Sequence, residues 1–365
     1  LELCREAGVK PLRADKSAQK RYVYSRGELH KLPEKPPEFL RSKLLTLPGR
    51  LRVIYELIAG GTDNPDETLA QFATRRLGSE AFDRLIDPMA SGVFAGNANE
   101  LSLKSCFPRI HEIEMEYGSL IRGLIKLQKK ARKSGAKNTP GPGPGGTLTS
   151  FDNGMSALTD SLATQLGSRI RTATPILDID RSGKRYLLKL ENGDEEECDT
   201  LILASPAYAQ SSMLRSMDPD LANLLDEIPY PALSVVCMGY RKQRVGSVLD
   251  GFGFLIPSKE KRSILGTIVD SNVFSGRAPE DSILLRSMVG GARTPEIALL
   301  PEQQLIDRVR SDLKDILKVT AEPDFVRIFR HKRAIPQYIV GHAGRLEAIQ
   351  EKLQQHPGLV LTGNA

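Results

Sequence analysis

The spacing of apolar residues changes twice along this chain, and this change constrains the fold more than any other feature. Residues 21–32 (RYVYSRGELHKL) alternate in polarity around Gly27, which predicts a hairpin or a short pair of strands. From about residue 36 to 130 the spacing is helical, and beyond residue 148 short runs of strand type return. The order of these patterns predicts an α+β body with an inserted helical lobe.

The helical region contains its own start and stop signals. Pro36 and Pro37 are predicted to open a first helix, and Asp66 is predicted to be the N-cap of a later one. Gly78 then provides a natural stop. The segment SGVFAGN (91–97) is predicted to be a glycine-rich turn between two further helices.

The second half of the chain alternates helices and strands, mostly strands of the antiparallel type. Helices are predicted at 156–166, 301–317 and 344–353, and strands at 169–180, 185–191, 200–204, 235–240, 252–256, 264–269, 283–289, 325–329 and 359–362, with ENGDEEE as a turn.

Charge and cysteine content exclude several classes of function. The net charge is +6, but aromatic residues are only 5% of the chain and do not interleave with the basic runs, so nucleic acid is not expected as a partner. The four cysteines show no metal-ligand spacing and no disulfide framework. No apolar run is long enough to span a bilayer. The basic run 126–137 (KLQKKARKSGAK) fits either a solvated helix end or contact with anionic lipid headgroups.

The chain has few side-chain signatures of catalysis. A literal GxGxxG occurs at Gly141, Gly143 and Gly146, but Pro142 and Pro144 lack the N–H groups that a phosphate cradle needs, so we reject it. Hydrolase motifs are absent and the five histidines are scattered. This pattern fits an enzyme whose reactive group is a bound cofactor, and it identifies no catalytic base and no metal site.

Several separated segments resemble those of one family, the FAD-dependent protoporphyrinogen oxidases. They occur in the family's order and cover nearly the whole chain: DPMASGVFAG (87–96) with ELSLKSCFPRIHEIEMEYGSLIRG (100–123), GFGFLIP (251–257) with SILGTIVDSNVFSGRAP (263–279), SMVGG (287–291), AIPQYIVGH (334–342) and LVLTGNA (359–365).

The resemblance implies an FAD-binding core, a substrate domain with a mixed or antiparallel sheet, and an inserted helical lobe that docks on a membrane. The expected division is substrate-domain strands in 1–35, the docking lobe in 36–136, a loop in 137–147, a partial FAD-binding domain in 148–204, the substrate-binding domain in 205–340 and a partial return to the FAD-binding domain in 341–365. The family's first strand–GxGxxG–helix unit is expected upstream of Leu1, and its flavin-facing helix beyond Ala365.

The resemblance also implies site residues for a flat, apolar substrate with carboxylates at one rim. Arg21 matches the family arginine that pairs with a substrate propionate, although its position alone favours a strand-edge arginine facing water. Gly92 matches the point where the backbone approaches the tetrapyrrole, and also fits a simple turn glycine. Phe252, Leu255 and Met288 match the apolar walls around the macrocycle, although core packing explains their spacing equally well.

For FAD, the resemblance implies a backbone contact from Ile176 to the adenine. It also places Gly363, Asn364 and Ala365 at the start of the flavin-contacting turn.

The activity that the resemblance implies is the six-electron oxidation of protoporphyrinogen IX by FAD and molecular oxygen at a bacterial, mitochondrial or plastid membrane, in heme and porphyrin biosynthesis. A homodimer is a further partner to consider. Two alternatives remain open: a coproporphyrinogen III oxidase of the same family, which must pair four carboxylates instead of two, and a fragment that binds porphyrinogen without catalysis.

Overall fold

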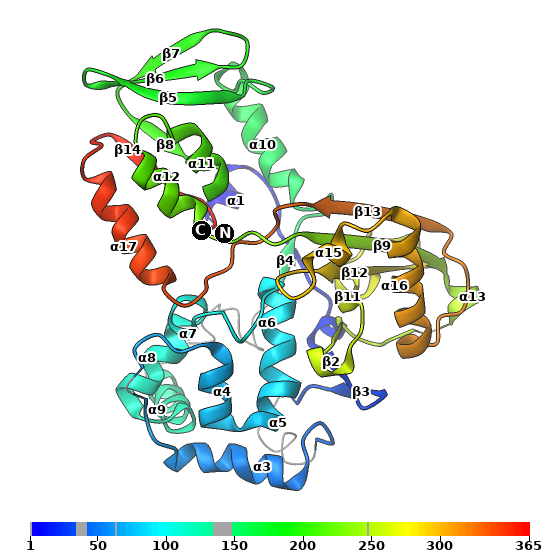
Figure 1. Ribbon diagram of the computed structural model, residues 1–365. Helices are drawn as coiled ribbons and strands as arrows, with labels where there is room; N and C mark the ends of the chain where they lie inside the picture. Colours follow the sequence, from blue (N-terminus) through cyan, green and yellow to red (C-terminus); the bar gives the residue numbers. More distant parts are fainter. Residues whose placement is uncertain (1, 34–41, 63, 134–147, 247) are drawn as a thin grey trace.

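The computed structural model describes residues 2–33, 42–62, 64–133, 148–246 and 248–365. The helix predicted at Pro36 and Pro37, the loop 137–147 and its GxGxxG lie outside the described residues. Helices and sheets are mixed, which confirms the α+β class. Figure 1 shows three regions: an upper lobe with α17, a body built on one large sheet, and a lower lobe of helices.

The body is a mixed seven-stranded sheet. Its spatial order is β13 (Phe325–His331), β9 (Leu233–Arg241), β12 (Ser282–Gly290), β11 (Ile264–Val269), β10 (Gly253–Leu255), β2 (Arg21–Ser25) and β3 (Glu28–Lys31). All neighbours are antiparallel except β10 and β2, which are parallel. The predicted hairpin is therefore confirmed as β2 and β3, and its turn places Arg26 and Gly27 at positive φ, as a tight two-residue hairpin turn requires.

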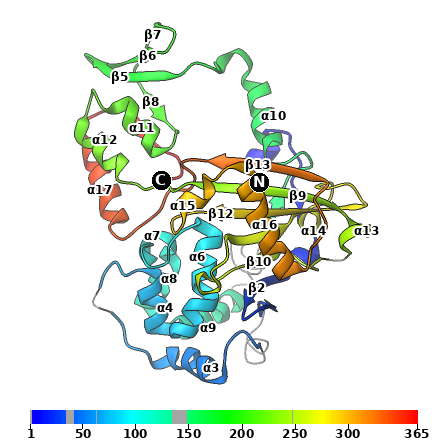
Figure 2. The same ribbon diagram turned by 45° about the vertical axis from the view of Figure 1, so that its right-hand side comes forward.

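One face of this sheet is buried under α16 (Glu302–Leu317), as Figure 2 shows. Met238 and Leu285 on the sheet and Leu305 on the helix have no exposed surface, because period 2 and period 3.6 bring apolar side chains to a shared layer. Asp312 of α16 accepts the backbone N–H of Ser263 at 2.8 Å, which fixes the helix to the start of β11.

The upper lobe contains a parallel strand pair, β8 (Leu201–Leu203) and β14 (Leu359–Leu361), and an antiparallel sheet, β5 (Ile176–Ser182), β6 (Arg185–Leu190) and β7 (Glu195–Cys198). The acidic segment predicted as a turn contains β7, and the strand predicted from 169 begins only at Ile176. The helices of this lobe are α1 (Glu2–Glu6), α10 (Ser156–Leu166), η4 (Gly167–Arg169), α11 (Ala207–Leu214), α12 (Pro219–Asp226) and α17 (His342–Leu353).

The lower lobe consists of helices around Leu69, Phe72 and Leu101. Asp66 is not the N-cap of α4; Thr68 is, in a capping box with Gln71. Asp66 instead accepts the Ser102 hydroxyl and the Gly341 N–H. The elements are α3 (Leu47–Ile54), η2 (Tyr55–Ile58), α4 (Leu69–Leu77), α5 (Ser79–Ala81), η3 (Phe82–Ile86), α6 (Asp87–Phe94), α7 (Leu103–Cys106), α8 (Pro108–Tyr117) and α9 (Leu120–Lys133).

The glycine-rich turn predicted at 91–97 is wrong for residues 91–94, because α6 continues through Gly92 to Phe94. The helix ends at Ala95 in the left-handed region, and residues 95–97 are non-helical, as predicted. Glycine fits at this point of the helix because the side chain of Leu255 lies close to the backbone. A Cβ placed on Gly92 would lie 2.5 Å from Cδ2 of Leu255.

Short elements complete the described chain. They are β1 (Leu12–Arg13), β4 (Thr149–Ser150), η1 (Lys16–Gln19), α13 (Lys242–Val245), η5 (Ser258–Glu260), α14 (Asp270–Val273) and α15 (Pro295–Ala298). Of these, α14 follows directly on β11 and borders the sheet face that α16 leaves free, where Asp270 meets Arg286.

Candidate functional site

The sheet face opposite α16 carries an apolar row. Strand register aligns one residue from each of six strands across the sheet: Phe329, Val235, Met288, Gly266, Leu255 and Val23. Side chains in such a row project to the same face, since they are cross-strand partners. Leu255 and Met288, which the resemblance assigned to the site, therefore belong to one apolar surface.

Arg21 lies in the adjacent row, at the start of β2. Its backbone pairs with Gly253, and its guanidinium carbon lies 5.5 Å from the centre of the Phe252 ring. No described carboxylate forms an ion pair with Arg21. The side chain is half-buried, so it is neither a core residue nor a freely solvated one, and its cationic end is available for an anionic group beside an apolar wall.

Gly92 completes this surface from the lower lobe. It contacts the Leu255 side chain, and α6 packs near the ends of β10 and β11. The structure thus brings Gly92 to Leu255 and Arg21 to Phe252, and places Met288 in the same row as Leu255.

An ion pair that the sequence analysis did not identify fixes α6 at this position. Asp87 is buried at the start of α6 and pairs with Arg293, while its second oxygen accepts the Ser258 N–H at 2.8 Å. The two partners follow β12 and β10, so one carboxylate joins the lower lobe to two strands of the sheet. The DP dipeptide at a helix start was the only sequence signal for it.

The second part of the candidate site is the end of β14 in the upper lobe. Gly363 adopts a φ of 142°, and a Cβ there would lie 3.3 Å from the Ser205 carbonyl oxygen. Asn364 is held by two tyrosines: Tyr338 donates its hydroxyl to the Asn364 carbonyl at 2.6 Å, and Tyr230 donates to its side chain at 3.4 Å. Ala365 follows, exposed.

This turn fits a flat cofactor at the carboxyl ends of β8 and β14, where open parallel sheets bind ligands. The Ser205 hydroxyl oxygen is buried beside Gly363 and has no hydrogen-bond partner in the described structure. Buried Gln210 donates to the carbonyls of Leu203, Ser205 and Thr362, which holds both strand ends at a fixed separation. An unpartnered polar atom beside a glycine turn is the arrangement that a bound flavin would complete.

Ile176 lies at the start of β5, in a different sheet of the upper lobe. Its side chain packs against the apolar cluster that also contains Leu201 and Leu359. Its backbone pairs with Leu190 next to a register shift. The structure places it in the same lobe as the Gly363 turn, and its adenine contact stays a prediction.

Tyr338 connects the lower lobe to the β14 turn. Its ring stacks on His342 at 4.6 Å between ring centres, and its edge meets Phe94 of α6. His342 is almost fully buried at the start of α17. Burial, together with the nearby charge of Arg345, lowers the pKa of His342 to about 4, so the imidazole is neutral at pH 7.

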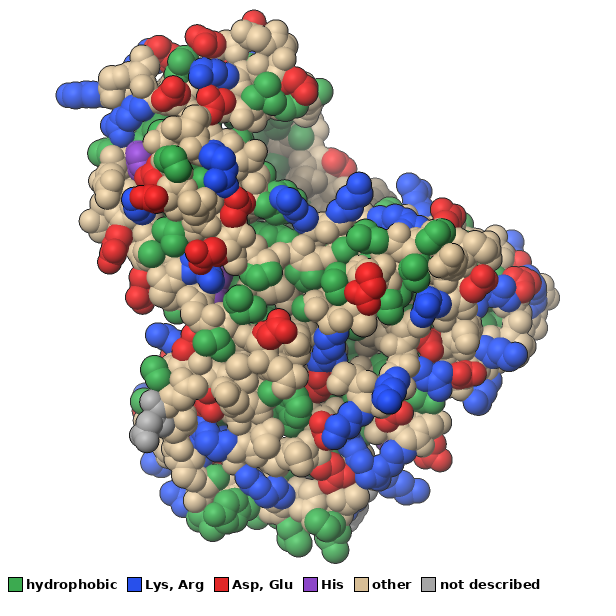
Figure 3. All heavy atoms as spheres, viewed as in Figure 1, with side chains coloured by type: hydrophobic (Ala, Val, Ile, Leu, Met, Phe, Trp, Pro, Cys, Tyr) green, Lys and Arg blue, Asp and Glu red, His purple; other side chains and the backbone are tan. Residues whose placement is uncertain are grey.

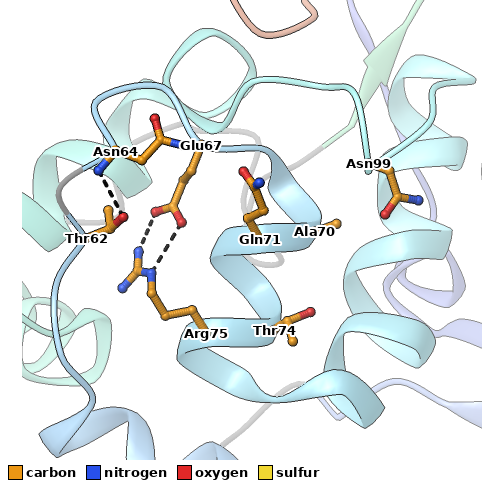
Figure 4. Close-up of a pocket in the computed structure, with 8 residues that line it drawn as sticks. All are labelled: Thr62, Asn64, Glu67, Ala70, Gln71, Thr74, Arg75 and Asn99. Atoms are coloured by element: carbon orange, nitrogen blue, oxygen red, sulfur yellow. Dashed lines mark hydrogen bonds and ion pairs between the residues drawn. The ribbon is translucent and has the colours of Figure 1, made fainter.

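A surface pocket lies elsewhere, in the lower lobe. Figure 4 shows Glu67 and Arg75 paired across it, with Asn64, Gln71 and Asn99 around them. Its ions are already paired, and it contains none of the predicted site residues. Among the described residues, no group of histidines, cysteines and carboxylates could hold a metal ion.

Comparison with known proteins shows the family of this chain. The family model described as flavin containing amine oxidoreductase matches residues 1–365, and the chain belongs to this family. The flavin cofactor, FAD, and the oxidoreductase class are thereby confirmed.

Two curated relatives narrow the comparison. The chain is 32% identical to a chloroplastic protoporphyrinogen oxidase of Oryza sativa subsp. japonica, covering 94% of this chain and 68% of that protein. It is 28% identical to the coproporphyrinogen III oxidase of Bacillus subtilis (strain 168), covering 99% of this chain and 78% of that protein.

A solved structure is also similar over nearly the whole chain. This protein, from Exiguobacterium sp. 255-15, is provisionally assigned as a protoporphyrinogen oxidase. It superimposes with a TM-score of 0.81 at 26% identity, covering 99% of this chain and 79% of that one. The match extends over all three regions of the molecule, so that protein has a similar arrangement of the lobes.

Proposed function

We propose that this chain oxidises a porphyrinogen, with protoporphyrinogen IX as substrate and protoporphyrin IX as product. The observation that carries the proposal is the sheet face on which an apolar row, closed by Gly92, adjoins Arg21, which has no ion pair with a described carboxylate. A macrocycle with apolar faces and carboxylates at its rim has this same combination of surfaces. The names of the relatives support the same substrate class.

The proposed reaction removes six hydrogen atoms, as six electrons and six protons, from the macrocycle. Three molecules of oxygen take up these electrons and protons, giving three molecules of hydrogen peroxide. The flavin supplies the hydride-accepting chemistry when it is bound.

The chain's own residues supply binding and orientation. Arg21 captures a carboxylate, since a planar guanidinium suits two-point contact with it. Leu255 and Met288 exclude water from the macrocycle and support it from one side. Gly92, lacking a side chain, allows α6 to approach the ring closely, and Gly363 and Asn364 would lie against the flavin.

The test uses the purified chain with FAD and anaerobically prepared protoporphyrinogen IX. We expect a stoichiometric flavin spectrum, oxygen uptake and appearance of porphyrin fluorescence. Replacing Arg21 by Met should raise KM much more than it lowers kcat, because the contact is made in the ground state as well. A folded, colourless protein without turnover would support porphyrinogen binding without catalysis and would reject the proposed oxidase.

Coproporphyrinogen III is the second candidate substrate, favoured by the Bacillus subtilis relative. The measurement that separates the two is kcat/KM on each porphyrinogen with the same preparation. A hundredfold preference for coproporphyrinogen would replace the first proposal by the second.

We also propose that the lower lobe docks on a membrane surface. Leu47, Leu51 and Ile58 of α3 and η2 are 67%, 59% and 68% exposed, and Figure 3 shows apolar side chains gathered at the lower end of the molecule, where α3 lies in Figure 1. The basic helix α9 packs beside η2 and brings exposed Lys129 and Lys130 to the same lobe. The proposed contact is peripheral, through the exposed apolar side chains of α3 and η2. No described helix is both long and apolar enough to cross a bilayer.

Liposome flotation tests this contact. Vesicles with anionic lipid should carry the protein, and replacing Leu47 and Leu51 by Ser should release most of it. Leu299, also exposed but on the body, provides the matched control when replaced by Ser. Equal flotation of all variants would contradict docking through α3. The homodimer stays a prediction.

A further inference from the structure

The sheet face that carries Arg21 contains two more arginines in the same row. The register aligns Arg327, Cys237, Arg286, Ile268, Gly253 and Arg21 across six strands. This row lies two residues along each strand from the apolar row of Met288 and Leu255. One face of one sheet therefore has an apolar row and, directly beside it, a row that contains three arginines.

Arg286 is the cation nearest to Arg21 in this row. Three strand spacings separate them, so their backbones lie roughly 14 Å apart. Between them are only Ile268 and Gly253, so no charged side chain intervenes. Both arginines lie on the same side of the Met288–Leu255 wall.

Arg286 is held in place by one carboxylate, which does not use all of its hydrogen-bond donors. Asp270 of α14 accepts its Nη2 at 2.7 Å, and the arginine side chain is still 43% exposed. No other described acceptor bonds its guanidinium. Asp270 thus orients the arginine and leaves donors for an anionic ligand, and the three arginines of the row outnumber this single carboxylate.

The opposite edge of the apolar row has a different character. Two residues further along the same strands, the register places Gly290 beside Leu233, and α6 closes this side by contact of Ala95 with Gly291. His331 is the one titratable side chain in that row, at its outer end. A macrocycle on this face thus has a cationic edge and a largely apolar edge.

We propose that Arg286 is a second carboxylate anchor, which together with Arg21 binds the two carboxylates of one macrocycle edge. The inference rests on the proposed function and deepens it: the site selects porphyrinogens by two carboxylates on a single edge. Protoporphyrinogen IX has its two propionates on adjacent rings and its vinyl groups opposite. One in-plane orientation therefore places the propionates at the cationic edge and the vinyl groups at the apolar edge. Coproporphyrinogen III would place two further carboxylates against the apolar edge.

Equilibrium binding of stable porphyrins tests this assignment without turnover. The probes are protoporphyrin IX, its dimethyl ester, which keeps the ring and removes both charges, and coproporphyrin III. The readout is the porphyrin absorption and fluorescence on titration with protein. The variants are Arg286→Met, Arg286→Lys, Arg21→Met and, as control on the α16 side of the sheet, the exposed Arg308→Gln.

We expect Arg286→Met and Arg21→Met each to weaken protoporphyrin IX binding by about tenfold to a hundredfold, the usual effect of removing one charge-assisted contact. Neither should change binding of the dimethyl ester, and Arg286→Lys should retain part of the affinity. The wild-type protein should prefer protoporphyrin IX to coproporphyrin III. Unchanged circular dichroism would show that the variants are folded.

Three results would overturn the inference. Equal loss of acid and ester binding in Arg286→Met would show a structural role, and no loss of either would show that Arg286 does not contact the ligand. Wild-type preference for coproporphyrin III would contradict the apolar edge. The proposed oxidation of a porphyrinogen would survive each of these results, although the third would favour coproporphyrinogen III as its substrate. A wild-type protein that binds no porphyrin would overturn both the inference and the proposed function.

Discussion

The lower lobe and the sheet body bury different kinds of groups in their interiors. In the lower lobe, Arg76 is 1% exposed and donates to Glu114 at 2.6 Å, near the fully buried Glu56. In the body, Met238 and Leu285 pack against α16 with no charge between them. The stability of the lower lobe therefore depends on a few buried, paired charges, and the stability of the body depends on buried apolar area.

The difference shows how short helices can be fixed where little apolar area is available. Glu56 accepts the N–H groups of Leu120 and Ile121 and the Ser119 hydroxyl, so one carboxylate caps the start of α9. A capped helix start satisfies donors that would otherwise be buried and unpaired. In the body, the buried carboxylate of Asp312 accepts the N–H groups of Ser263 and Ile264 at the start of β11, and the rest of the contact between α16 and the sheet joins matched apolar faces.

The largest expected effect is on the buried charges. Arg76→Met leaves the buried Glu56 without its cation and Glu114 with Arg75 as its remaining cation, and should destabilise the lower lobe by about 3–5 kcal/mol. Hydrogen exchange should then accelerate in α4, α8 and α9 but not in the sheet. Arg109→Met, in an exposed ion pair of the same lobe, should leave exchange unchanged. Equal acceleration in both regions would show that they unfold as one unit.

The matching change in the body is Leu285→Ala. It opens a cavity in an apolar core, at a cost of about 2–5 kcal/mol, and exchange should accelerate in β9, β12 and α16. Denaturant unfolding followed by residue-specific exchange would measure both changes. Faster exchange in α4 and α8 as well would show that the two regions do not unfold independently.

The junction between the regions should be sensitive to acid. Buried His342 has its pKa lowered to about 4 against an ordinary 6.5, so the unfolded chain binds a proton that the folded chain does not. The stabilisation is complete above pH 6.5 and decreases as the pH falls toward 4, by roughly 2–3 kcal/mol over that interval. His342→Asn should flatten this part of the stability profile, and an unchanged profile would assign the acid sensitivity to other groups.

The smallest effect is expected where the lower lobe touches the sheet. Gly92→Ala places a methyl group against Leu255, and should cost about 1–2 kcal/mol through overpacking. The double variant with Leu255→Ala should recover stability but not porphyrin binding, because the wall residue is gone. Thermal unfolding measures the first result and porphyrin titration the second. A single variant as stable as the wild type would show that Leu255 moves aside freely.

Much of the local structure was predictable from the sequence. The hairpin around Gly27, the strands of the body and the helices at 156–166, 301–317 and 344–353 follow from apolar period and turn residues. The errors arose where a long-range contact overrode a local signal. Gly92 was predicted to lie in a turn, but packing on Leu255 keeps it in α6, and Asp66 was predicted as a cap but bonds to Ser102 and Gly341.

The candidate site was only partly predictable. The resemblance named Arg21, Gly92, Phe252, Leu255 and Met288. The structure places Arg21, Leu255 and Met288 on one sheet face, with Gly92 of α6 against Leu255 and Phe252 beside Arg21, although their roles stay predictions. Arg286 gave no signal, because an arginine in an alternating strand is common. Asp87 had only the DP dipeptide, which is common at helix starts. The sequence did not identify Ser205 and Gln210 either, because their contacts exist only where β8 and β14 meet.

The sequence by itself thus determined which segments are strands and helices, and which side chains of a strand share a face, because both depend on local period. Tertiary structure alone decided that Arg21 and Arg286, separated by most of the chain, stand in one row beside an apolar wall. That row depends on hydrogen-bond register among β2, β10, β11 and β12, which is set by non-local pairing and by packing against α16 and α6.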